Sequence, residues 1–158
     1  ATVKPTLTTD EVVEEAIAFG WIDSVPRRLD AERSMLYVSP RTPGSNWSRL
    51  SKERAARMEA AGQMTDAGRA TIVRAQADGT WTALDDVENL IVPDDLAAAL
   101  AAHPPARAEW DGFPRSTRRG ILEWILTARR ETTRANRIAD TARLAQQGKR
   151  ANQWPREG

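Results

Sequence analysis

The sequence has no cysteine and only one histidine among its 158 residues. A chain without cysteine cannot form a disulfide scaffold, a thiolate zinc site or a thiol nucleophile. With a single imidazole, transition metals lack their usual protein ligands, so we predict no metal and no cofactor. That imidazole belongs to His103, which closes an Ala-rich stretch before two prolines. A helix C-terminal cap is favoured there over catalysis.

Long apolar runs are also missing. The longest clear run extends from Ile121 to Leu126 and is interrupted by Glu123. Such a run is too short to cross a bilayer, and no signal peptide is evident. We therefore predict a protein without a membrane span that is located in the cytoplasm.

The chain lacks the usual local signatures of catalysis. It contains no Gly-rich phosphate loop, no nucleophile elbow and no convincing Ser/His/Asp set. We therefore assign no catalytic residue, and a non-enzymatic protein is favoured while an enzyme stays open.

What is present predicts a mainly helical α+β protein. The length suits a single domain, which we place at 1–150 with a tail at 151–158. β-branched and aromatic residues at about 21–25 and 35–39, with turn formers between them, predict a small antiparallel hairpin within about 19–48. Helical periodicity continues over about 51–148 and predicts a C-terminal helical region. The hairpin is expected to pack against helices.

The first helix has a well-marked start. Thr8 followed by Glu11 is a capping-box pattern, and Leu7 with Val12 has the spacing of a hydrophobic staple. The buried face of this helix is predicted to consist of four apolar residues, Val12, Val13, Ala16 and Ile17. Gly20 is expected to end it.

The net charge of +1 hides an asymmetry along the chain. Residues 1–114 carry 12 Lys/Arg and 18 Asp/Glu, whereas residues 115–158 carry 11 and 4. The basic end is either a docking surface for the acidic part of the chain or a site for an external anion, and internal docking is the favoured interpretation.

One candidate ligand site combines indoles with opposite charges. Trp21 and Asp23 alternate by two, so on a strand they point to one face. Arg41 and Trp47 follow the second predicted strand, where a loop could fold over that face. These residues could form a pocket with flat apolar walls and a fixed ion pair, or a purely structural ion pair under a tryptophan lid. The predicted ligand-binding residues are Trp21, Asp23, Arg41, Ser45, Trp47 and Ser48.

A second candidate site is basic. If Arg130 belongs to the final helix, then Arg130, Arg134 and Arg137 lie at positions i, i+4 and i+7 and form a ridge that could grip phosphate or carboxylate groups. The alternative is that these arginines pair with Asp23, Asp30 or the acidic connector at 85–89. Nucleic acid is the less favoured partner, because the tryptophans mostly fall at core-like spacings.

A set of motifs extends over about Glu14 to Gly148. It consists of Phe19-Gly20-Trp21-Ile22-Asp23, Pro40-Arg41, Ser45-Asn46-Trp47-Ser48, Gly62-Gln63-Met64-Thr65 with Gly68, Asp78-Gly79-Thr80-Trp81, Val92-Pro93-Asp94-Asp95-Leu96, and Thr133-Arg134 with Arg137-Ile138. This set resembles the YdeI/OmpD-associated family, the bacteriocin-protection proteins. The resemblance implies a bacterial cytoplasmic stress protein that protects against bacteriocins or antimicrobial peptides, with no established catalytic residues. Family members carry a strand-bearing segment before the first helix, so the resemblance also implies a shortened amino-terminal part.

Together these observations predict a non-enzymatic protection protein. It would bind a small molecule, a peptide or a protein near the Trp21/Arg41 cluster, and a homodimer is possible. Two alternatives stay open. One is an adaptor for nucleic acid or another anionic partner through the basic helix, and the other is an unrecognised enzyme that uses Asp23 as acid or base with Arg41 orienting an anionic substrate.

Overall fold

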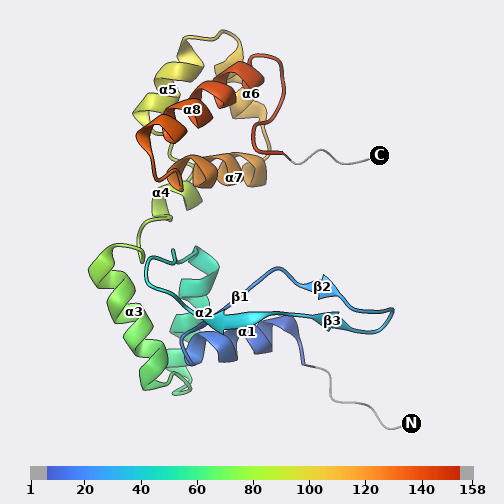
Figure 1. Ribbon diagram of the computed structural model, residues 1–158, viewed down its shortest axis with the longest axis vertical. Coiled ribbons are helices and arrows are strands. Elements are labelled where there is room, and N and C mark those ends of the chain that lie inside the picture. The colour runs from blue at the N-terminus through green and yellow to red at the C-terminus, as the bar shows by residue number, and fades with distance from the viewer. Residues whose placement is uncertain (1–6, 154–158) are drawn as a thin grey trace. The chain divides into compact units, whose positions relative to one another are not determined.

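The computed structural model describes residues 7–153 (Figure 1). Contacts divide the chain into two compact units, Ala1–Leu84 and Asp85–Gly158. The elements of both units are mostly helices, and short antiparallel strands occur in the first, which confirms the predicted fold class. Whether 1–150 behaves as one domain is not decided by this division, so that prediction stays a prediction. Most of the predicted tail, residues 154–158, lies outside the described residues.

The first helix, α1 (Thr9–Ala18), starts as its sequence predicts. Glu11 donates its backbone N–H to the Thr8 hydroxyl at 3.2 Å, and the Thr8 backbone N–H donates to the Glu11 carboxylate at 2.7 Å. This reciprocal capping box satisfies two N–H groups that a helix start would otherwise leave open.

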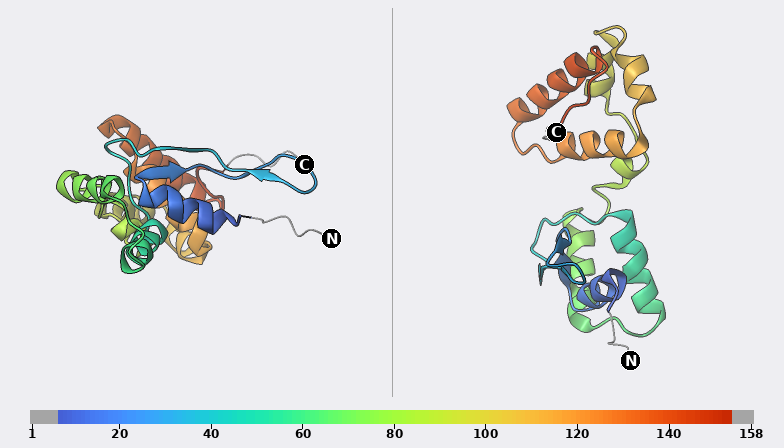
Figure 2. Two further views of the ribbon diagram at one scale, coloured as in Figure 1. Left: turned by 90° about the horizontal axis from the view of Figure 1, so that it is seen from below. Right: turned by 90° about the vertical axis from the view of Figure 1, so that its right-hand side faces the viewer.

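The hairpin follows α1 after a tight turn. Strand β1 (Trp21–Asp23) pairs antiparallel with β4 (Val38–Pro40), and β2 (Arg27–Arg28) pairs with β3 (Ser34–Met35). The first predicted strand, at 21–25, thus ends early at Asp23, and the second, at 35–39, is interrupted between Met35 and Val38. Pro26, which has no N–H for a ladder, lies in the gap between β1 and β2. Figures 1 and 2 show the β2–β3 end projecting away from the helices of this unit.

Helices α2 (Arg49–Ala60) and α3 (Asp66–Asp78) complete the first unit. Ser48 and Thr65 cap them by accepting hydrogen bonds from backbone N–H groups three residues on. The core of the unit gathers apolar side chains from α1, α2, α3 and their connecting loops: Val13, Ile17, Ala18, Trp47, Ala55, Met58, Met64 and Ala75.

Helices are the only regular elements among the described residues of the second unit. It contains α4 (Asp85–Glu88), α5 (Asp94–Ala101), α6 (Ala106–Gly112), α7 (Arg115–Leu126) and α8 (Glu131–Ala145). Helix α8 packs against α5, α6 and α7, around buried Trp110, Ile121, Ile125 and Ala142 (Figure 2). The His103 ring Nδ1 lies 2.9 Å from the Ala99 carbonyl oxygen, near the end of α5. Because a carbonyl can only accept, Nδ1 carries the proton there, in agreement with a capping role.

Candidate functional site

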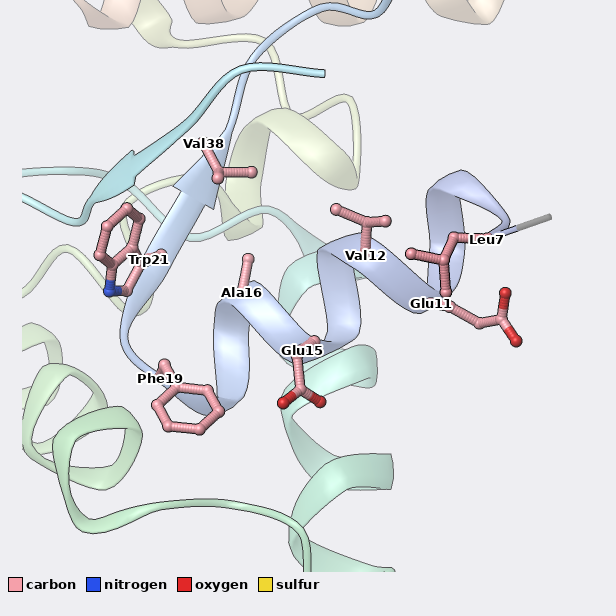
Figure 3. A pocket seen from close by; sticks show the side chains of 8 residues that line it. All are labelled: Leu7, Glu11, Val12, Glu15, Ala16, Phe19, Trp21 and Val38. Atoms are coloured by element: carbon pink, nitrogen blue, oxygen red, sulfur yellow. The ribbon is translucent and has the colours of Figure 1, made fainter. Parts of the chain in front are cut away.

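A groove of about 650 Å³ runs along α1 beside the β1–β4 strands. Figure 3 shows Val12 and Ala16 of α1 turned toward Val38 of β4, with Trp21 of β1 beside them. Leu7 and Phe19 lie at the two ends of the helix, and Glu11 and Glu15 complete the lining. This volume falls within the range of ligand pockets in proteins, about 300–1,000 Å³.

The local sequence explains why this groove exists. Val13, Ile17 and Ala18 of α1 are buried in the core. The adjacent helix face, with Val12 and Ala16, lies beside the core and lines the groove. Gly20, with a φ of +76°, then turns the chain so that β1 runs back beside α1. A side chain at position 20 would be strained by this φ and would meet Thr71 and Ala67. The strands thus form a second wall parallel to the helix.

The groove exposes apolar side chains that a folded protein would ordinarily cover. The exposed fraction is 76% for Leu7, 51% for Phe19 and 40% for Trp21. An apolar patch of this kind, bordered by charged groups, is typical of an interaction site.

Two rows of residues, each with the i, i+4 spacing of a helix, make up the α1 side of the groove. The inner row is Val12 and Ala16. The outer row is Leu7, Glu11, Glu15 and Phe19, so two carboxylates stand between two apolar ends. Among the lining residues that the structure describes, none is a lysine or arginine, which gives this part of the groove an acidic edge.

The other two carboxylates of α1 have partners within the unit. Arg54 forms an ion pair with Asp10, and Arg57 donates to Glu14 at 2.6 Å. Glu15, in contrast, forms no ion pair with any residue that the structure describes. Hydrogen bonds from the Thr8 backbone and hydroxyl lower the pKa of Glu11 below its ordinary value, so its carboxylate stays ionised at neutral pH.

The predicted Trp21/Arg41 cluster is divided by the structure. Trp21 lines the groove, whereas Trp47 and Arg41 are buried, with exposed fractions of 1% and 6%. The Arg41 guanidinium lies 4.0 Å from the centre of the Trp47 ring and donates to the Asn46 carbonyl at 3.1 Å. Burial lowers the pKa of Arg41 to about 10, and the charge of Asp23 partly opposes this shift. Arg41 and Trp47 therefore pack as part of the core.

The remaining predicted ligand-binding residues take part in local structure. The Ser48 hydroxyl caps α2, and the Ser45 hydroxyl lies 3.1 Å from that of Thr42. The space beside Arg41, Ser45 and Trp47 has a cavity volume of about 0 Å³, which is far below the size of a ligand pocket. Asp23 interacts electrostatically with Arg41 but forms no salt bridge with it among the described residues.

The three arginines predicted to form a basic ridge are placed differently from one another. Arg130 is the N-cap residue of α8, with extended backbone, and so lies outside the helix. Arg134 forms a two-point ion pair with Asp95, at 2.8 and 3.0 Å. The sequence had suggested Asp23, Asp30 or the acidic connector as its partner instead. Arg137 stacks over the Trp124 ring at 4.9 Å and donates to the Trp124 carbonyl. Two of the three thus join α8 to other helices.

Sequence reasoning missed most of the groove. It assigned Val12 and Ala16 to the buried face of α1, but both are only partly buried. The sequence signal that could have revealed the groove is the four-residue spacing of Leu7, Glu11, Glu15 and Phe19. Leu7 and Phe19 add to the apolar stripe of α1 more surface than one core can cover.

The described part of the chain contains neither a cluster of metal ligands nor a membrane-spanning helix. No group of three or more His, Asp or Glu side chains there could hold a metal ion. Among residues 7–153, no helix has the length and apolar character needed to cross a bilayer.

Two family models match the chain, in separate segments. Residues 1–71 match a domain of unknown function (DUF8412). Residues 89–148 match the family described as bacteriocin-protection, YdeI or OmpD-associated. No curated protein matches the chain, and no solved structure matches it.

These matches confirm the predicted resemblance for the helical segment from 89 to 148, which contains α5 to α8. The motifs between Phe19 and Trp81 lie outside that segment, and their resemblance to the same family stays a prediction. The groove belongs to the segment that matches the domain of unknown function.

Proposed function

We propose that the protein is a non-enzymatic binding protein with a role in protection against bacteriocins, and that its ligand site is the groove along α1. The match of residues 89–148 to the bacteriocin-protection family supports the role. The observation that carries the binding site is the groove of about 650 Å³ with its exposed Leu7, Phe19 and Trp21. Burying these side chains against a ligand would release about 25 cal/mol for each Å² of apolar surface.

The two alternative functions have less support. An adaptor that uses the basic helix would need free guanidinium groups, but Arg134 and Arg137 are engaged inside the second unit. An enzyme that uses Asp23 with Arg41 would need the arginine to reach a substrate, and Arg41 is buried against Trp47. The proposal includes a cytoplasmic location.

The binding site can be tested with a neutral apolar probe. N-phenyl-1-naphthylamine should bind the wild-type protein with a rise in probe fluorescence and an increase in melting temperature, because a ligand of the native state stabilises it. Trp21→Ala should weaken binding severalfold by removing one wall of the groove. Ile91→Ala is the matched control, since Ile91 is 54% exposed in the second unit, far in sequence from the groove.

Equal binding to all three proteins would show that the groove is not the site. Unchanged melting temperatures with this probe and with a panel of metabolites and peptides would count against the whole proposal.

A further inference from the structure

We infer that the occupant of the α1 groove is a cationic amphipathic polypeptide segment of about three helical turns. This inference rests on the proposed function, because it names the class of partner for the same groove. It is carried by the distribution of charge and apolar surface along α1.

The charge of α1 is compensated on one side only. Asp10 and Glu14 lie one turn apart and pair with arginines of α2. Glu11 and Glu15 lie one turn apart on the groove side, where none of the described lining residues is basic. An apolar groove beside two uncompensated carboxylates complements a ligand that carries both apolar and basic side chains.

The Glu11 carboxylate can still accept a hydrogen bond from a ligand, although it takes part in the capping box. Both hydrogen bonds from Thr8 end on the same oxygen, Oε2, at 2.7 and 2.8 Å. Oε1 accepts no hydrogen bond from the described residues. It can therefore receive a lysine or arginine of the ligand while the capping box stays intact.

The dimensions of the groove set the length of the segment. Helix α1 has 10 residues, or about 15 Å at 1.5 Å per residue, and Leu7 and Phe19 extend the lining beyond its two ends. A partner helix of about a dozen residues covers this distance. Its apolar face would meet Val12, Ala16 and Trp21, and two basic residues four positions apart would face Glu11 and Glu15.

The same charges argue against other partners. Anionic lipid surfaces and nucleic acids attract basic proteins, whereas the edge of this groove is acidic. A polypeptide with lysine or arginine on one face is the partner that the groove favours.

The test uses two synthetic 14-residue peptides with the same leucine positions, one with lysine and one with glutamate at the polar positions. Calorimetry of the full chain should show binding of the lysine peptide and none of the glutamate peptide. Raising NaCl from about 50 to 500 mM should weaken binding of the lysine peptide, because salt screens exposed charges.

The decisive variant is Glu11→Gln with Glu15→Gln. Glutamine is also accepted at the third position of a capping box, so the fold of α1 should be retained. We expect binding of the lysine peptide to fall about tenfold and to lose most of its salt dependence. The matched control is Glu53→Gln with Glu131→Gln, which changes the net charge equally at two exposed positions outside the groove.

Several outcomes would overturn the inference. One is equal binding of both peptides, and another is equal loss of affinity in the two double variants. A dimer that dissociates in Trp21→Ala would make a second copy of the chain the occupant. If the neutral probe binds in a Trp21-dependent way while the lysine peptide does not bind, the proposed groove stands and only the partner class is wrong. If neither binds, the proposed function itself fails.

Discussion

Individual arginines of this protein have different structural roles, which depend on their surroundings. Arg41 is buried over an indole ring, and desolvation of its charge lowers its pKa to about 10. Arg134 lies nearer the surface and forms a two-point ion pair with Asp95. Residue type alone does not separate these roles, because both depend on what the fold places next to the guanidinium.

The Arg134–Asp95 pair predicts a dependence of stability on pH. The hydrogen bond from Arg134 lowers the pKa of the Asp95 carboxyl below its ordinary value of 3.8. A lowered native-state pKa stabilises the fold at pH values above the ordinary pKa, and this stabilisation is lost as the pH falls through the native value. Arg134→Ala should therefore reduce the free energy of unfolding at pH 7 by about 0.5–1 kcal/mol, since the pair is partly exposed.

Urea unfolding followed by circular dichroism measures this difference. It should shrink toward zero as the pH falls below 3.8 and through the lowered native pKa of Asp95, because the carboxyl then becomes protonated in both proteins. Arg129→Ala is the control, because Arg129 is exposed and lies before α8. A loss for Arg134→Ala that stays constant from pH 7 to pH 2 would mean that the arginine acts through packing and not through the ion pair.

Among the elements of the first unit, α1 and α3 are in close contact at Gly68. A Cβ atom at this position would lie 2.3 Å from the Ala18 carbonyl oxygen and 2.5 Å from the Met64 sulfur. The same carbonyl accepts hydrogen bonds from the Thr65 hydroxyl at 2.6 Å and the Thr65 backbone N–H at 3.2 Å. The end of α1 is thus held against the start of α3, and this contact orients the helix that forms the groove.

We predict that Gly68→Ala lowers the free energy of unfolding by about 1–3 kcal/mol, because the added methyl group overpacks this crossing and the backbone carbonyl cannot move aside alone. Gly120→Ala is the matched control. Gly120 lies within α7 with nothing near its missing Cβ, so the substitution should raise stability by about 0.5–1 kcal/mol through helix propensity. Chemical denaturation of both variants checks the prediction, and equal effects would contradict the proposed clash.

For the molecule as a whole, the charge asymmetry along the sequence does not follow the division into units. Residues 1–84 carry 11 basic and 11 acidic residues, and residues 85–158 carry 12 and 11. Within the second unit, the basic carboxy-terminal helices meet the acidic stretch that precedes them. Arg119 pairs with Glu88 at 3.0 Å, and Arg134 pairs with Asp95 at 2.8 Å. These contacts support internal docking, the favoured interpretation of the basic end.

The near-neutral charge of each unit and its own buried core favour independent folding. We predict that segments 1–84 and 85–158, produced separately, each show helical circular dichroism and a cooperative thermal transition. The sum of their spectra should match that of the full chain. If either segment is unfolded alone, the chain behaves as the single domain that its length suggests.

Local features of this protein could be read from the sequence. Thr8 starts α1, because its side chain bonds to an N–H group only three residues away. The mainly helical α+β class followed from hydrophobic periodicity, which is also a local property of the sequence.

Only the tertiary structure decided which side chains become available at a site. The spacing of Val12, Val13, Ala16 and Ile17 identifies an apolar stripe but not which part of it the core will cover. That choice depends on the packing of α2, α3 and the hairpin, which come later in the sequence. In the same way, Arg134 meets Asp95 across 39 positions of chain, a pairing that no local pattern specifies. Contacts between sequence-remote elements therefore set the groove and its charge, because local spacing carries no information about which elements meet.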